Sequence, residues 1–441
     1  MVNALSIAGS DSVGGAGLQA DLKAFEALGV HACTVVTAVT SQNTRGVSSI
    51  FPLPAKEVAM QLSSVLEDVE LDAIKTGMLY SADIVKIVAS LLREVEAPIV
   101  VDPVMTATTG SDLHITGFLE ALVTKLLPMS ALVTPNLYEA ERMTGIKVKD
   151  ERTARRAAQE ILELGPDAVL LKGGHLKGAE AADYLCTDGR IVKIVSPRID
   201  AEVHGTGCAL GSIIAGNLAL GHELEDAVRI SKGMIYKAIL ARERVGMGVP
   251  CANPLAILRI EAQKAPMLEQ LEDAGHELEE VMDSTLLPEV GTNMGYAVLG
   301  ALEPNEVAAF DGRIVRIRTR ARRIGAARFG ASKHVARIVL AASSRNPEIR
   351  CAMNAKYSEE NVEACKKARL SVATFDRAKE PKGVSSMTWG VLWAIDKHGS
   401  VPDIIFDKGG IGKEPMIRIL GRDPPEVISK LKRIKSKRAK G

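Results

Sequence analysis

Residues 204–216 read His-Gly-Thr-Gly-Cys-Ala-Leu-Gly-Ser-Ile-Ile-Ala-Gly, a glycine-rich turn that runs directly into an apolar segment. The pattern predicts a helix whose first backbone N–H groups are unpaired and face whatever precedes the helix. Such a helix end binds anions, most naturally a phosphate group in transfer. Cys208 falls in the first turn, where we expect the pKa of a thiol to be lowered and where a base for a hydroxyl group would be useful. The stretch alone is equally compatible with a glycine-rich loop around a small buried cysteine.

Length and composition narrow the class of protein. The 441 residues exceed one ordinary domain, and 46% hydrophobic residues suffice for two or three cores. The balance of 55 basic against 54 acidic residues argues against a general nucleic-acid-binding or membrane-surface protein. The six cysteines are scattered without a CxxC pair, which argues against zinc or disulfides. With no basic leader and no apolar run of membrane-spanning length, we expect a soluble cytoplasmic protein.

The first 255 or so residues alternate short β-rich runs with amphipathic segments. This alternation predicts a largely parallel sheet with helices on both faces. The expected strands are residues 4–8, 32–38, 99–104, 131–134 and 168–172. The expected helices are residues 17–28, 56–66, 81–92 and 150–164.

Four separated segments place phosphate-handling groups at strand ends or in tight turns. Residues 8–17 form a glycine-rich turn that lets backbone N–H groups approach a small polar ligand. Asp102 ends a buried strand, where open α/β sheets bind ligands, although helix capping is the alternative. Asn136 and Glu139 lie one helical turn apart and can hold water on Mg²⁺, although Asn136 alone would more often be an N-cap. Lys172 stands beside a Gly-Gly turn, which suits ATP phosphates.

Together these segments resemble the hydroxymethylpyrimidine and hydroxymethylpyrimidine-phosphate kinases of the ribokinase-like superfamily. The resemblance covers about residues 3–255, in the order AGSDSVGGAGLQADLKAF, TAVTSQNT, KTGML, VVDPVM, TPNLYEA, LKGGH and HGTGCALGS. It is specific, because the sugar kinases of this superfamily carry Asp at the position of Cys208. It implies a ribokinase-like, three-layer α/β/α domain with a mostly parallel sheet, which uses ATP and Mg²⁺ to phosphorylate hydroxymethylpyrimidine and then its phosphate.

The resemblance also implies roles for single residues. Cys208 would be the base on the substrate hydroxyl, beside an anion hole formed by Gly205, Thr206 and Gly207. The ATP would lie against Lys172, Asn136, Gly205 and Gly207, and Mg²⁺ would be organised by Asp102, Glu139 and, through water, Asn136.

The pyrimidine would be bound by Gly9, Asp11, Gln42, Met78 and Val104. Gln42 would pair with the aminopyrimidine edge, whereas Met78 could equally be plain core. Pyridoxal is the rival substrate, because pyridoxal kinases share much of this chemistry.

After Pro254 the alternation of β-rich runs and amphipathic segments ends. A charged helical stretch, which could link or dock two domains, precedes a second α+β pattern with glycine turns of its own. The predicted boundaries are residues 1–258 for the first domain, 259–284 for a helical linker, 285–431 for the second domain and 432–441 for a basic tail. We expect the tail to be a frayed, solvated C-terminus rather than a nucleic-acid-binding segment.

Residues 313–328 contain seven arginines. Arg316, Arg318, Arg320 and Arg322 alternate with other residues, so a single strand would place them on one face. Such a face suits bidentate phosphate binding, and a solvated basic strand is the alternative. His334 follows a glycine turn just beyond these cations.

This half is similar to the archaeal-type (ThiN-type) thiamine-phosphate synthase domain over roughly residues 270–431. The segments NMGYA, RFGASKHVAR and FDKGGIGKEPM carry the similarity. It implies an α/β fold other than a TIM barrel, in which the pyrimidine loses pyrophosphate and the thiazole phosphate captures its methylene carbon. Arg320 and His334, with Lys413 as a further candidate, would contact the departing pyrophosphate or the thiazole phosphate.

The fusion itself favours two enzymes, because the kinase product would be the substrate of the synthase. Two alternatives remain open for the second half. Domains of this type also occur in regulators that sense thiamine phosphates beside a helix-turn-helix, and an inactive domain could serve as a feedback site on the kinase. We expect small-molecule substrates, no nucleic acid, no membrane and a homodimer.

Overall fold

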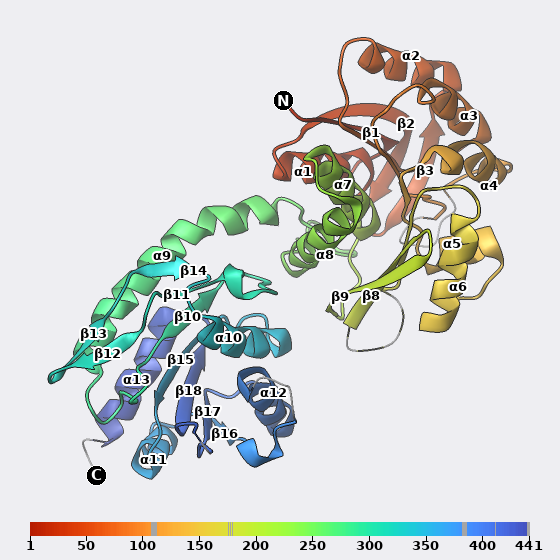
Figure 1. Cartoon of the computed structure of the whole chain (residues 1–441). Helices are drawn as coiled ribbons and strands as arrows, with labels where there is room; N and C mark the ends of the chain where they lie inside the picture. Colours follow the sequence, from red (N-terminus) through yellow and green to blue (C-terminus); the bar gives the residue numbers. More distant parts are fainter. Residues whose placement is uncertain are drawn as a thin grey trace. The chain divides into compact units, whose positions relative to one another are not determined.

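The computed structural model describes residues 1–106, 113–174, 176, 178, 180–381, 386–410 and 412–438. Within this part of the chain, two compact units cover Met1–Arg259 and Ile260–Gly441 (Figure 1). Each unit has its own sheet and its own core.

The first unit is built on a nine-stranded sheet in the order β3-β2-β1-β4-β5-β6-β7-β8-β9. The pairs from β2 to β7 are parallel, and the antiparallel pairs β2–β3, β7–β8 and β8–β9 lie toward the edges. The strands are β1 (Asn3–Asp11), β2 (His31–Asn43), β3 (Gly46–Pro52), β4 (Ala73–Thr76), β5 (Ile99–Val101), β6 (Leu132–Val133), β7 (Val169–Lys172), β8 (Glu180–Thr187) and β9 (Arg190–Pro197).

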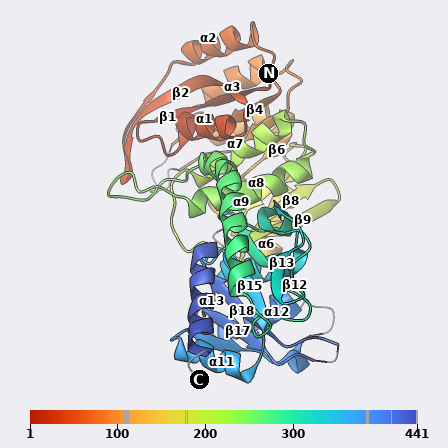
Figure 2. The ribbon, with the colours of Figure 1, turned by 90° about the vertical axis from the view of Figure 1, so that its left-hand side faces the viewer.

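Helices cover both faces of this sheet, because successive strand residues are apolar on both sides. Ala4 and Ala73 belong to the core under α1, α7 and α8, whereas Leu5 and Ile74 belong to the core under α2, α3, α4 and α6 (Figures 1 and 2). The helices are α1 (Gly17–Ala27), α2 (Ala55–Leu66), α3 (Ala82–Leu91), α4 (Phe118–Ala121), α5 (Leu137–Thr144), α6 (Glu151–Leu162), α7 (Thr206–Ala219) and α8 (Leu224–Leu240). The three-layer, mostly parallel fold predicted for this half is confirmed.

The second unit contains an open seven-stranded sheet in the order β14-β11-β10-β15-β18-β17-β16, in which only β16 and β17 pair in parallel. Its strands are β10 (Met294–Ala297), β11 (Val307–Phe310), β14 (Ala327–Phe329), β15 (Cys351–Lys356), β16 (Val372–Thr374), β17 (Ile404–Asp407) and β18 (Met416–Gly421). Its helices are α9 (Ala256–Val281), α10 (Lys333–Arg345), α11 (Glu359–Lys367), α12 (Ser386–His398) and α13 (Pro424–Arg438). The sheet is open, as an α/β fold other than a TIM barrel requires.

Two segments outside the predicted second domain, 285–431, contribute to its packing. The stretch 259–284, for which we expected a linker, is mostly helix α9, and its Leu271 and Leu278 are fully buried in the core of the second unit. Helix α13 lies beside α9 in Figures 1 and 2 and continues to Arg438, with Ile434 buried. The predicted tail, 432–441, is therefore helical as far as residue 438, and residues 439–441 lie outside the described part of the chain.

The arginine-rich stretch is a separate two-stranded ribbon, β12 (Ile314–Ile317) and β13 (Arg320–Arg323). The expected single face of four arginines is wrong, because the chain turns at Arg318, whose φ is 56°. Arg316 pairs with Ala321, whereas Arg320 pairs with Ile317. Residues paired across a ribbon share a face, so Arg316 and Arg320 lie on opposite faces.

Candidate active sites in the two units

The first unit contains a cavity of about 690 Å³ where the parallel strands end. This is the edge at which open α/β sheets bind ligands. All the residues predicted for the kinase site line this cavity: Gly9, Asp11, Gln42, Met78, Asp102, Val104, Asn136, Glu139, Lys172, Gly205, Thr206, Gly207 and Cys208. The structure therefore brings together groups from seven separated segments of the sequence.

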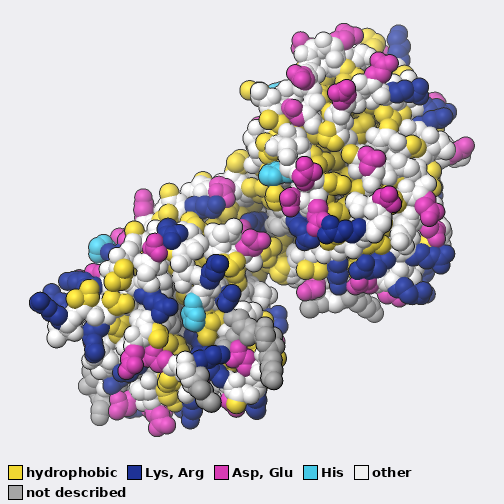
Figure 3. Space-filling view, in the orientation of Figure 1, with side chains coloured by type: hydrophobic (Ala, Val, Ile, Leu, Met, Phe, Trp, Pro, Cys, Tyr) yellow, Lys and Arg dark blue, Asp and Glu magenta, His cyan; other side chains and the backbone are white. Residues whose placement is uncertain are grey.

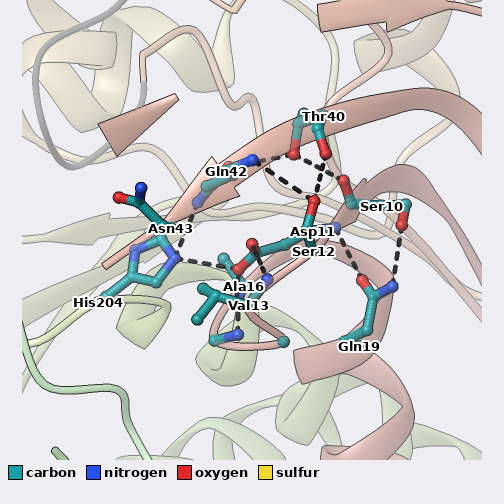
Figure 4. Close-up of polar contacts among 12 residues, drawn as sticks. Ser10, Asp11, Ser12, Val13, Ala16, Gln19, Thr40, Gln42, Asn43 and His204 are labelled. Carbon is teal, nitrogen blue, oxygen red and sulfur yellow. Dashed lines mark hydrogen bonds and ion pairs between the residues drawn. The ribbon is translucent and has the colours of Figure 1, made fainter. Parts of the chain in front are cut away.

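Asp11 organises the glycine-rich turn between β1 and α1. Its carboxylate accepts hydrogen bonds from the backbone N–H groups of Val13, Gly15 and Ala16 at 2.8–3.0 Å (Figure 4). Burial raises the pKa of Asp11, but a hydrogen bond with His204 and those from the backbone outweigh burial, so the pKa lies below its usual value. An ionised Asp11 thus holds the turn that forms one wall of the cavity.

Gln42 contacts His204 rather than standing free in the cavity. The Gln42 Nε2 and His204 Nε2 atoms are 3.0 Å apart, and the same ring nitrogen lies 3.2 Å from Asp11 Oδ2 (Figure 4). His204 is buried, and it connects the residue expected to read the pyrimidine edge with the residue that shapes the turn. His204 is the first residue of the glycine-rich stretch 204–216, but no role was predicted for it from the sequence.

The predicted anion hole is the first turn of α7. Gly205 caps this helix with a φ of 80°, a conformation that favours glycine. A Cβ atom on Gly205 would lie 1.7 Å from the carbonyl oxygen of Gly15, so the helix end packs directly on the glycine-rich turn. Gly205, Thr206, Gly207 and Cys208 at this helix end all line the cavity, which is where a phosphate-binding helix N-terminus would be needed.

The expectation that helix position lowers the pKa of Cys208 is wrong. Burial raises the pKa of this thiol to about 11; Lys75 lowers it, while Asp102 and Asp21 raise it. Although Cys208 lines the cavity, the surrounding protein excludes water from the thiol. This burial raises the pKa more than the helix N-terminus lowers it. At neutral pH, Cys208 is therefore predominantly a thiol.

Lys75 and Asp21 form a fully buried ion pair that sequence reasoning missed. The Lys75 Nζ atom lies 2.9 Å from Asp21 Oδ2 and 3.0 Å from Oδ1. The same carboxylate accepts hydrogen bonds from Ser6 and Ser212. The available signal was a single basic residue inside the short apolar run Ala-Ile-Lys-Thr of β4.

Asp102, Lys172 and Glu139 form a charged group at the ends of β5 and β7 and the start of α5. The Lys172 Nζ atom lies 2.8 Å from Asp102 Oδ1. Burial raises the pKa of Glu139 to about 7; Lys172 opposes this effect and Asp102 adds to it. Asn136 is the N-cap of α5 and forms a capping box with Glu139, which is the alternative considered for this residue.

These residues fit a magnesium ion held through water. Two buried carboxylates lie near one another, and an additional cation would favour the ionised form of Glu139. The Asn136 amide oxygen is already occupied by the helix cap. Within the described ranges, no three His, Cys, Asp or Glu side chains converge as metal ligands, so water and substrate phosphates would complete the coordination.

A third Lys–Asp pair, which was not predicted from the sequence, also lies at the cavity. Lys232 of α8 lies 2.6 Å from Asp183 of β8, and the other oxygen of Asp183 accepts the N–H of Gly173. Gly173 follows Lys172 directly, so Asp183 fixes the backbone that carries the predicted ATP-binding lysine.

In the second unit, His334 lies in the first turn of α10 among arginines. Displacement of water from the ring and then the charges of Arg418, Arg313, Arg377 and Arg337 lower the pKa of His334 to about 4. The His334 side chain is exposed at the start of α10, and the nearby arginine charges disfavour its protonated form. Figure 3 shows basic side chains gathered on this face of the second unit.

Arg377, Arg418 and Asp407 form what we call the arginine cluster. Asp407 Oδ2 lies 2.9 Å from Arg418 and 3.0 Å from Arg377, and neither Asp407 nor Arg418 is exposed. The Nε and Nη1 atoms of Arg418 have no hydrogen-bond partner among the described residues. Two guanidinium groups thus share one carboxylate, which leaves the cluster with a net positive charge.

The other two residues predicted for this unit lie elsewhere. Arg320 is exposed on the ribbon and is not among the arginines with the strongest effect on His334. Lys413 lies in the loop between β17 and β18, 3.2 Å from Glu380. Sequence reasoning missed the arginine cluster, although Arg418 is a lone basic residue in the apolar strand Met-Ile-Arg-Ile-Leu-Gly.

In the part of the chain that the structure covers, no helix is long and apolar enough to cross a membrane. The six cysteines are all free thiols.

Comparison with known proteins agrees with the division into two units. A family model described as phosphomethylpyrimidine kinase matches residues 11–253, and one described as thiamine-phosphate synthase ThiN matches residues 270–433. The bifunctional thiamine biosynthesis protein ThiDN of Methanocaldococcus jannaschii is 34% identical over 428 residues, which cover 97% of each chain. The hydroxymethylpyrimidine/phosphomethylpyrimidine kinase of Streptomyces coelicolor is 46% identical over 246 residues, 56% of this chain and 91% of that protein.

Solved structures similar to the first unit include two pyridoxal kinases. An ADP complex of Bacillus subtilis pyridoxal kinase matches with a TM-score of 0.55 and 33% identity, over 59% of this chain and 99% of that chain. The Staphylococcus aureus pyridoxal kinase in complex with AMP-PCP and pyridoxal matches with a TM-score of 0.55 and 31% identity, over 59% and 96%.

Proposed function

Because the chain belongs to the family of bifunctional thiamine biosynthesis proteins that join a phosphomethylpyrimidine kinase to a ThiN-type thiamine-phosphate synthase, we propose a role for the residues of each site. The first unit is the kinase and the second is the synthase. One cavity in the first unit serves both phosphorylations, first of hydroxymethylpyrimidine and then of its phosphate. The observation that carries this assignment is that all the predicted kinase residues line that single cavity.

In the kinase, the substrate hydroxyl lies beside Cys208 and the γ-phosphoryl group of ATP lies at the first turn of α7. The substrate oxygen forms a bond to the γ-phosphorus, the bond to ADP breaks, and the thiolate form of Cys208 accepts the hydroxyl proton. Phosphoryl transfer of this kind depends mainly on positioning and on neutralising charge, which the N–H groups of α7 and Lys172 provide. Mg²⁺, held through water by Asp102 and Glu139, would neutralise the phosphate charges when bound.

A direct comparison of substrates tests the kinase assignment. Similarity to pyridoxal kinases keeps pyridoxal as the second candidate. With Mg-ATP and equal concentrations of the two compounds, we expect a higher kcat/KM for hydroxymethylpyrimidine. A preference for pyridoxal would overturn the assignment.

Replacing Gln42 with alanine tests the binding of the pyrimidine edge. Loss of a buried hydrogen bond to the substrate is expected to raise KM for hydroxymethylpyrimidine about tenfold, with a smaller effect on kcat. Steady-state kinetics measure both constants. Asn43→Ala is the matched control, because Asn43 is exposed at the end of the same strand and does not line the cavity. Equal KM values for Gln42→Ala and the wild-type protein would remove Gln42 from the pyrimidine site.

In the synthase, we place the phosphate-bearing substrates at the arginine cluster and His334 rather than at Arg320. The carbon–oxygen bond of the pyrimidine pyrophosphate breaks, and the pyrophosphate leaves with the electron pair. The ring nitrogen of the thiazole phosphate then bonds to the methylene carbon. Arg377 and Arg418 would stabilise the charge that develops on the departing pyrophosphate, which supports an enzyme at this position.

Binding of pyrophosphate should change the protonation of His334. In the protein without bound pyrophosphate, the surroundings of His334 lower its pKa to about 4, so the ring is neutral at pH 6. A bound anion favours the protonated ring and must therefore raise this pKa. We expect NMR titration of the His334 ring, assigned with a His334→Gln variant, to show a pKa higher by about a unit or more in saturating inorganic pyrophosphate. The same pKa in pyrophosphate and in chloride of equal ionic strength would contradict this placement.

An inactive sensor domain is the second candidate for this unit. A site for anions could bind thiamine phosphate without catalysing its formation. The test supplies pyrimidine pyrophosphate and thiazole phosphate to the full chain without ATP. Mass-spectrometric detection of thiamine phosphate supports the synthase, whereas tight binding of thiamine phosphate without turnover supports a sensor.

We also infer a cytoplasmic homodimer with small-molecule substrates only. The free state of all six cysteines is consistent with a reducing compartment. Light scattering of the purified chain would test the dimer.

A further inference from the structure

The buried pair of Lys75 and Asp21 contacts the helix that carries Cys208. Lys75 stands near the end of β4 and lines the cavity together with Cys208. A Cβ atom on Gly211, one turn beyond Cys208, would lie 3.7 Å from Lys75 Cε, and Ser212 donates a hydrogen bond to Asp21. The ion pair therefore packs against the first two turns of α7.

The two partners of this pair differ in how fully they are satisfied. Asp21 accepts hydrogen bonds from Lys75, Ser6 and Ser212. Lys75 has three N–H donors, and within the described residues its only hydrogen-bond acceptor is the Asp21 carboxylate. A buried ion pair seldom stabilises a fold more than apolar residues would, so a cation with an unused donor at the cavity requires another explanation.

The charges around Cys208 give a reason for a buried lysine at position 75. Lys75 and Lys172 are the cations that interact with the thiol, and Asp21 and Asp102 are the carboxylates. Lys172 is bound to Asp102, as Lys75 is bound to Asp21. Without Lys75, the thiolate form of Cys208 would face the uncompensated carboxylate of Asp21.

We propose that Lys75 is a positioning residue that stabilises the thiolate form of Cys208, the form that accepts the proton of the substrate hydroxyl. The proton moves from the hydroxyl to the Cys208 thiolate, which becomes a thiol, while the oxygen electron pair forms the bond to the γ-phosphorus and ADP leaves with the electron pair of the broken bond. Lys75 gives up no proton in this step and acts only through its charge. The inference rests on the proposed role of Cys208 as the base.

The test measures alkylation of Cys208 in the full-length protein by iodoacetamide at pH 9, quantified by mass spectrometry of the Cys208 peptide. Alkylation requires the thiolate, so its rate follows the thiolate fraction. We expect Lys75→Met to slow it about tenfold or more and to lower kcat, because each unit of thiol pKa changes the thiolate fraction tenfold. Lys75→Arg, which keeps the charge, should restore most of the rate. Alkylation of Cys208 in Lys75→Met at the wild-type rate would overturn the proposal.

Two controls separate charge from structure. Lys232→Met removes the other buried lysine of the cavity and should leave the alkylation rate of Cys208 nearly unchanged. Alkylation of the buried Cys251 reports unfolding in every variant. If Lys75→Met does not fold, the Asp21→Asn variant tests the proposal instead. It leaves the lysine charge uncompensated and should therefore accelerate alkylation of Cys208. A slower or unchanged rate in folded Asp21→Asn contradicts the proposal.

Failure of this inference is distinguishable from failure of the proposed function. Near-wild-type kinase activity of Cys208→Ala would remove Cys208 as the base, whatever the alkylation rates are. Loss of activity in Cys208→Ala, together with unchanged alkylation in Lys75→Met, would overturn only the role of Lys75.

Discussion

Cys208→Ala should lower kcat for phosphorylation of hydroxymethylpyrimidine by about 10²–10⁴-fold, the range expected for loss of a general base. The variant keeps the helix end and the lysines that bind phosphate, so KM for ATP should change little. The fold should also persist, because alanine is smaller and the residue lies at a cavity rather than in the core. Steady-state kinetics with Mg-ATP measure the effect, and circular dichroism checks the fold.

Cys33→Ala is the matched control for Cys208→Ala, since Cys33 lies in β2 of the same unit and does not line the cavity. Its kcat should equal that of the wild-type protein. The raised pKa of Cys208 adds a second expectation. Because burial raises that pKa to about 11, kcat/KM should rise with pH above neutrality as the thiolate fraction grows. Wild-type turnover in Cys208→Ala would exclude the thiol from the mechanism.

Arg377→Gln should abolish most thiamine phosphate formation while leaving the kinase intact. The substitution removes one of the two guanidinium groups that share Asp407. Loss of one such charged donor from a water-poor site is expected to lower kcat about 10²–10³-fold. The measurement is thiamine phosphate production from pyrimidine pyrophosphate and thiazole phosphate, with ADP release as the parallel assay of the kinase.

Arg320→Gln provides the contrast for Arg377→Gln, because it removes an arginine from the exposed ribbon instead of the arginine cluster. We expect it to retain synthase activity. If Arg320→Gln lost activity and Arg377→Gln kept it, the synthase site would have to move to the ribbon.

The sequence was sufficient to predict a largely parallel sheet with helices on both faces for the first unit, because β-rich and amphipathic segments alternate with clear periodicity. The strand expected at residues 4–8 is part of β1, the strand expected at 168–172 contains β7, and the helix expected at 17–28 extends one residue beyond α1. Strands β3, β4, β8 and β9 were not predicted, and in β4 Lys75 interrupts the apolar run. The residues of the glycine motifs line one cavity because their backbone geometry is local.

The parts that could not be predicted depend on long-range charge pairing. Arg418 meets Asp407 and Arg377 only when three segments fold together, and a buried arginine in a strand gives a weak signal. The ribbon turn at Arg318 occurs without glycine, asparagine or proline, so the alternation of arginines indicated one strand where two exist. The pKa of Cys208 had the wrong predicted direction, because burial is not readable from a helix position.

We propose that one chain converts hydroxymethylpyrimidine and thiazole phosphate to thiamine phosphate. The most direct measurement gives the intact chain both compounds with Mg-ATP and follows every phosphorylated species over time by mass spectrometry. We expect pyrimidine monophosphate, then pyrimidine pyrophosphate, and then thiamine phosphate with release of inorganic pyrophosphate. Accumulation of pyrimidine pyrophosphate without thiamine phosphate would contradict the account.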